Sequence, residues 1–149
     1  TDYAYNLIIA RYNSDRRRRL SVELSTRSGG YFNGTRANLD GSLNYRLQPY
    51  GSISLDFSLN RIRLPEPYND ANLVLIGPRF DITFTRNLFW TTFIQYNNQI
   101  DNVNVNSRLQ WRFRPVSDLF VVYTDNYYPN NFLSKSRALV LKCTYWLNL

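Results

Sequence analysis

The chain has 149 residues, enough for one domain over residues 1–149, and a formal net charge of +7 from 18 Lys and Arg against 11 Asp and Glu. Aromatic residues make up 16% and include 12 Tyr, whereas Met is absent and helix-favouring residues are scarce, which argues against an α-rich fold. Because there is no His and only one Cys, the composition excludes a Ser-His-Asp triad, the commonest transition-metal sites and an internal disulfide.

Apolar and polar side chains alternate with a period of two along most of the chain, which is the pattern of β-strands and not of helices. We therefore predict an all-β fold of antiparallel, meandering strands. The nine expected strands cover residues 3–12, 19–27, 35–48, 51–63, 72–85, 88–98, 102–114, 118–127 and 136–149.

The two faces of these strands differ in polarity. In the segment 102–114, for example, Val105 and Leu109 share one face while Asn106 and Arg108 share the other. The polar face is expected to line a barrel lumen and to form a network of mixed charges, with Glu23, Asp40, Arg46, Asp56, Arg79, Asp81, Arg108, Arg112 and Lys142. The apolar face is expected to contact lipid, with Leu39, Leu43, Leu55, Phe57, Val105, Leu109, Leu141 and Leu147.

The strand lengths favour a membrane protein. No run of about 18 apolar residues predicts a transmembrane helix. Most predicted strands, however, exceed the usual five or six residues and suit the roughly 9–11 residues that cross a bilayer on a tilt. We therefore expect a transmembrane β-barrel of eight or nine strands in the outer membrane of a Gram-negative bacterium. A soluble lipocalin-like barrel, with its apolar face turned inward around a small ligand, is the alternative.

The predicted connectors give an orientation. Short ones occur at Gln48–Gly51, Thr85–Leu88 and Pro115–Ser117, and longer ones around Ser28–Gly34, Leu64–Ala71 and Tyr128–Lys135. Two connectors depart from this rule: Ser14–Arg18 is on the predicted turn side but is not minimal, and Asn97–Asn102 is on the predicted loop side but is not long. In outer-membrane barrels the short turns face the periplasm.

Strand parity predicts that the chain does not close alone. A closed antiparallel barrel needs an even number of strands, because nine would make the first and last strands parallel neighbours. The chain also starts without Met or a leader pattern. We expect it to be the C-terminal segment of a larger barrel, whose partners are outer-membrane lipid and either the upstream part of the same barrel or another outer-membrane protein.

Two blocks of sequence resemble a known family. They are GPRFDITFTRNLFWTTFIQYNNQ, from Gly77 to Gln99, and RLQWRFRPVSDLFVVYTDN, from Arg108 to Asn126. Both are similar to the C-terminal barrel of a large, uncharacterised family of outer-membrane proteins of Bacteroidota, in which a family-9-like carbohydrate-binding domain precedes the barrel. The resemblance implies an outer-membrane location and a larger parent protein, but it supplies no catalytic or ligand-binding residues.

The expected function is non-enzymatic. We predict no catalytic residue, no cofactor and no metal site, and a role either as a pore for small polar solutes or as a membrane anchor for an attached domain. The run Arg16–Arg19 fits contact with lipid phosphates or a periplasmic polyanion, or, more simply, a solvated turn at the membrane interface. Nucleic acid is not an expected partner, since the aromatic residues lie mostly on apolar faces and are not interleaved with Arg.

Overall fold

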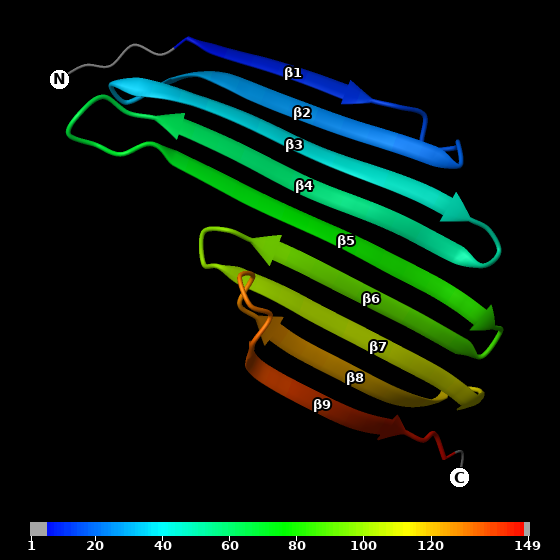
Figure 1. Ribbon diagram of the computed structural model, residues 1–149. Coiled ribbons are helices and arrows are strands. Elements are labelled where there is room, and N and C mark those ends of the chain that lie inside the picture. Colours follow the sequence, from blue (N-terminus) through cyan, green and yellow to red (C-terminus); the bar gives the residue numbers. More distant parts are fainter. Residues whose placement is uncertain (1–5, 148–149) are drawn as a thin grey trace.

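The computed structural model describes residues 6–147, which form one nine-stranded antiparallel sheet with the strands in sequence order (Figure 1). The strands are β1 (Leu7–Asn13), β2 (Leu20–Tyr31), β3 (Gly34–Leu47), β4 (Gly51–Arg63), β5 (Ala71–Thr85), β6 (Leu88–Asn97), β7 (Asn102–Arg114), β8 (Ser117–Tyr127) and β9 (Ser134–Thr144). No helix among these residues is long and apolar enough to cross a membrane. The expected all-β, antiparallel meander is confirmed.

Three strands have a boundary that differs from the predicted one by more than two residues. β1 starts at Leu7, and the predicted positions 3–5 lie outside the described residues. β9 covers Ser134–Thr144 where 136–149 was predicted, and residues 148–149 are likewise outside the described part. The third difference lies between β2 and β3, where the prediction of a long connector around Ser28–Gly34 is wrong. β2 continues to Tyr31, leaving a turn of Phe32 and Asn33 only.

The glycine pair in β2 explains this error. Gly29 is paired with Leu7 of β1, and a Cβ at Gly29 would collide with the backbone carbonyl of Asn6. The Gly30 amide donates a hydrogen bond to the same carbonyl at 3.2 Å. Glycine is needed here for the close approach of two strands and not for a turn.

The connectors lie at two opposite ends of the sheet (Figure 1). We call the end with connectors 14–19, 48–50, 86–87 and 115–116 the turn rim, and the end with connectors 32–33, 64–70, 98–101 and 128–133 the loop rim. Long connectors occur on the loop rim at 64–70 and 128–133, as predicted, but the turn rim also holds one, 14–19.

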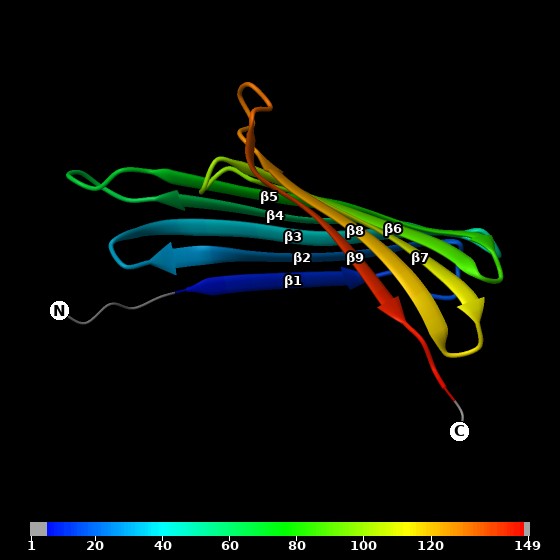
Figure 2. The ribbon, with the colours of Figure 1, turned by 90° about the horizontal axis from the view of Figure 1, so that it is seen from below.

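The sheet is twisted and open. Figure 2 shows β8 and β9 running at a steep angle to β1–β3, as the twist between neighbours accumulates across the strands. Within the described residues β1 pairs with β2 and β9 pairs with β8, so these two strands form opposite edges. Because neighbours are antiparallel throughout, β1 and β9 run in the same direction.

The sheet has no hydrophobic core. None of the hydrophobic side chains in residues 6–147 is buried, since a single layer leaves both faces uncovered. Soluble domains instead bury the apolar face of a sheet against a second layer. The described layer therefore gains little free energy from hydrophobic burial, which is the main term that stabilises a folded protein in water.

Candidate functional site

The nine residues predicted for a lumen all lie on the same side of the sheet, which we call the polar face. Directly paired residues of neighbouring strands project to the same side. Ser42 pairs with Asp56, and Asp81 pairs with Thr91, which in turn pairs with Arg108. The register extends this face across the sheet to Glu23, Asp40, Arg46, Arg79, Arg112 and Lys142.

The charges on the polar face form local pairs. Arg79 donates two hydrogen bonds to Asp81, at 2.9 and 3.2 Å, and Thr91 donates a third at 2.9 Å. Across residues 6–147, this is the only ion pair whose two partners both belong to the predicted lumen residues. The expected network of mixed charges is thus reduced to separate contacts.

Several of these residues bind partners that the sequence did not single out. Glu23 accepts from Arg16 in the β1–β2 connector, and Arg112 donates to Asp118 of β8 at 3.2 Å. Asp40 is held by the neutral Ser58 hydroxyl at 2.6 Å. Glu23, Asp40, Asp81 and Asp118 are thus each paired with or hydrogen-bonded by a group on the same strand, a neighbouring strand or an adjacent connector.

Amide side chains join strands β7, β8 and β9 near the loop rim. The Asn126 carbonyl accepts from Asn102 and Asn104, at 3.1 and 2.9 Å, and its amide donates to Ser136 at 2.9 Å. Asn106 donates to Thr124 at 2.8 Å. These uncharged ladders hold three strands in register and present a hydrophilic surface.

The polar face also carries aromatic rings. Phe93 pairs with Arg79, and its ring lies over Gly77, where a Cβ would be 3.1 Å from it. Phe89 and Phe120 are on the same face, because they pair with Gln110 of β7. These rings were not among the residues predicted for this side, because the sequence pattern assigned only charged groups to it.

The opposite side, the apolar face, holds seven of the eight residues predicted to contact lipid. Leu43 pairs with Leu55, and Gly41 with Phe57. The same register places Leu39, Val105, Leu109 and Leu141 on this side. Leu147 lies beyond the end of β9 and is in no strand. Exposure reaches 70% at Leu141.

One acidic residue lies within the apolar face. Asp125 of β8 pairs with Val105 and Arg137 and has 0% exposure. It accepts hydrogen bonds from Arg137 Nε and Ser134 Oγ, each at 2.6 Å, and from Tyr123 Oη at 2.7 Å. The cluster ties β9 to β8. The alternation already placed Asp125 in phase with Tyr123 and Val121, a signal that could have identified it.

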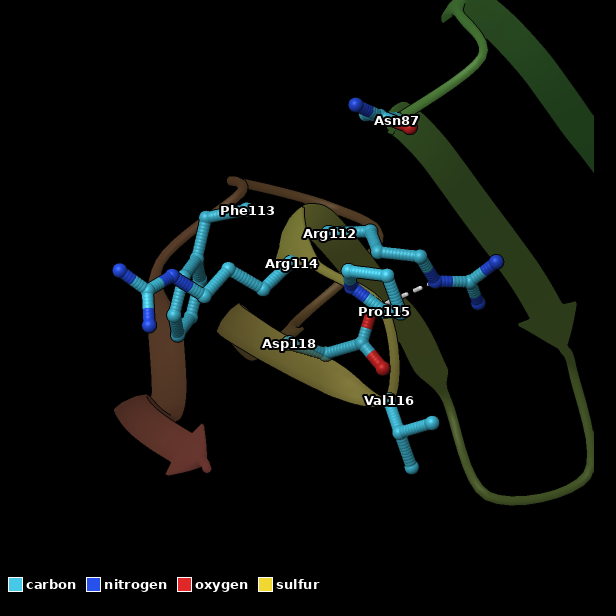
Figure 3. Close-up of a pocket in the computed structure, with 7 residues that line it drawn as sticks. All are labelled: Asn87, Arg112, Phe113, Arg114, Pro115, Val116 and Asp118. Atoms are coloured by element: carbon cyan, nitrogen blue, oxygen red, sulfur yellow. Dashed lines mark hydrogen bonds and ion pairs between the residues drawn. The ribbon is translucent and has the colours of Figure 1, made fainter. Parts of the chain in front are cut away.

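A cavity of about 650 Å³ lies at the turn rim between the β5–β6 and β7–β8 connectors. Figure 3 shows the guanidinium groups of Arg112 and Arg114 pointing to opposite sides of it. Arg112 bonds Asp118, and Arg114 donates to Tyr145 Oη at 2.9 Å. Both arginines are therefore already engaged, and the cavity offers no free cation.

The comparisons with known proteins add no assignment: no protein-family model, curated protein or solved structure matches the chain. The family resemblance of the two sequence blocks therefore stays a prediction.

Proposed function

We propose that this chain forms part of the wall of a transmembrane β-barrel in a Gram-negative outer membrane, with its apolar face in contact with lipid. The observation that carries the proposal is the uncovered apolar face on a meander of long strands. Eight of the nine strands have 10 to 15 residues. Lipid would cover this face without a second protein layer, whereas a soluble barrel would have to turn it inward.

The polar face then lines the interior. Its salt bridges and amide ladders resemble what an aqueous lumen tolerates, because charges there are paired and hydrated. The proposed activity is passive passage of small polar solutes. Phe89, Phe93 and Phe120 on this face favour a second candidate, a filled barrel that anchors an attached domain. Closing the wall would require an antiparallel partner strand at each of the two edges, β1 and β9.

Paired cysteine variants on adjacent positions test the orientation. The single native thiol is removed by Cys143→Ser, and one new cysteine is introduced at Leu55 or at its neighbour Asp56. Leu109 and Arg108 on β7 form a second pair. The variants are expressed in outer membranes and treated with a hydrophilic thiol reagent, and lipid contact is read by quenching of attached fluorophores with brominated lipids.

The cysteines at Asp56 and Arg108 should react with the hydrophilic reagent, and those at Leu55 and Leu109 should be quenched by brominated lipid. The proposal is wrong if both members of each pair react alike or if the chain is recovered in the soluble fraction. Conductance across a planar bilayer separates the two roles, since a pore gives open-channel current and a filled anchor does not.

A further inference from the structure

We propose that the turn rim carries a binding site for the phosphate group of an anionic lipid, formed by four arginines. A cavity of about 420 Å³ lies where the β1–β2 and β3–β4 connectors meet, and Arg17, Arg18, Arg19 and Arg46 line it. Gln48 and Tyr50 complete the polar part of the wall, and no carboxylate lines it. Guanidinium groups bind phosphate oxygens with paired hydrogen bonds, so this lining suits a phosphate group.

The arginines of this cavity are not neutralised by the protein. Across residues 6–147, no ion pair or side-chain hydrogen bond engages the guanidinium groups of Arg17, Arg18, Arg19 or Arg46. The two carboxylates of the same hairpin, Glu23 and Asp15, interact with other groups. Glu23 binds Arg16 at 2.6 Å, and Asp15 accepts from the backbone amide of Arg17 at 2.9 Å.

The cavity of Figure 3, at the same rim, provides a contrast within the molecule. There the two lining arginines, Arg112 and Arg114, bind Asp118 and Tyr145. Gathered, unpaired cations raise the local positive potential and attract an anion. The cavity lined by Arg17, Arg18, Arg19 and Arg46 is therefore the better candidate for an anion-binding site.

The two rims also differ in charge. The turn-rim connectors contain Arg16–Arg19 and Arg86 against one acid, Asp15. The loop-rim connectors contain Glu66, Asp70 and Asp101 and no Arg or Lys. An anionic ligand is accordingly expected at the turn rim and not at the opposite end.

The source of the phosphate follows from the neighbours of the cavity and rests on the proposed membrane location. Tyr50 is 71% exposed beside the arginines, and Trp111 is 50% exposed at the same rim. Tyr and Trp are enriched in the headgroup region of a bilayer, where lipid phosphates lie. Tyr45 and Leu47 of the apolar face line the cavity together with Arg46 of the polar face, so the cavity at the end of β3 is lined from both sides of the sheet. The ligand is therefore the phosphodiester of a lipid headgroup in preference to free phosphate.

The test compares ligands and variants. The chain, extracted from outer membranes in zwitterionic detergent, is titrated with short-chain phosphatidylglycerol, short-chain phosphatidylcholine or inorganic phosphate, and bound ligand is counted by native mass spectrometry. Arg18→Gln/Arg46→Gln removes two of the cavity's cations. Arg61→Gln/Arg63→Gln removes the same charge from exposed positions at the loop-rim end of β4. A heat-shift gel checks folding, and Arg18→Lys/Arg46→Lys keeps the charge without the paired hydrogen bonds.

The unaltered chain should bind phosphatidylglycerol about tenfold more tightly than phosphatidylcholine, because the arginines attract the net negative charge of the first headgroup and the second is zwitterionic. Arg18→Gln/Arg46→Gln should lose this preference, the lysine variant should keep part of it, and Arg61→Gln/Arg63→Gln should keep it fully. Equal loss in the control, or an unchanged preference in Arg18→Gln/Arg46→Gln, would overturn the site. Equally tight binding of inorganic phosphate would overturn the lipid assignment. The cysteine-labelling experiment does not change these four arginines. It therefore tests the membrane proposal independently of the lipid-binding site.

Discussion

Substitution of Leu55 by Arg tests the proposed contact between the apolar face and lipid. β4 has 13 residues, Gly51–Arg63. In the proposed barrel, with about 3.3 Å per residue and a tilt of about 40°, the strand would rise about 30 Å along the membrane normal. Leu55 then lies about 5 Å from the strand centre, inside an apolar band about 25 Å tall, whereas Ile53 lies about 10 Å from it, near the interface.

The expected costs follow from these depths. Leu55→Arg should reduce the free energy of unfolding by about 2–3 kcal/mol, and Ile53→Arg by about 1 kcal/mol or less. Ser54→Arg, between them in sequence but on the polar face, should cost less than about 1 kcal/mol, the cost of a like charge opposite Arg79. Unfolding by guanidinium from lipid vesicles, followed by tryptophan fluorescence, measures all three variants under the same conditions.

Two results would refute this reasoning. If Ser54→Arg costs as much as Leu55→Arg, the assignment of faces is wrong. If Ile53→Arg and Leu55→Arg cost the same, the cost does not depend on depth and the apolar face is not in a bilayer. On a solvent-exposed surface neither substitution would cost much.

Asp125→Asn should speed amide exchange in β9, because Arg137 loses its charged partner on the apolar face; hydrogen exchange by mass spectrometry measures this, and Asp125→Asn/Arg137→Gln should restore part of the protection. Unchanged exchange in β9 would show that the cluster does not hold this edge. Gly51→Ala should destabilise the chain by about 1–3 kcal/mol, since Gly51 has φ 149° and a Cβ there would collide with the Asp81 carbonyl oxygen. A denaturation midpoint equal to that of the unaltered chain would contradict this second expectation.

The strands were predictable because their alternation is a local property. The strand predicted at residues 35–48 matches β3 to within one residue at each end, and antiparallel pairing then places Asp40 and Asp56 on one face. Parity alone decides the side of each residue once a strand is recognised. This is why the nine polar residues were grouped correctly on one face from sequence.

The side-chain contacts between strands were not predictable in the same way. Whether Arg112 meets Asp118 depends on register, and the register shifts between Arg112 and Arg114 near the β7–β8 turn. Gly29 and Gly30 imitate a turn signal, but close approach to β1 requires them. The arginine cavity needs residues from two connectors, so the spacing of Arg16–Arg19 alone could not reveal the contribution of Arg46.

The sequential strand order has a consequence for assembly and for evolution. Paired residues are close in sequence: Gly51 and Ile82, for example, belong to the same hairpin. Forming the sheet therefore requires only the closure of short loops. Each strand can be added on the template of the preceding one, and the growing layer behaves as a nearly one-dimensional array. Duplication of a hairpin such as β3–β4 would then widen the layer while leaving the contacts of distant strands unchanged, a simple route by which sheets of this type gain strands.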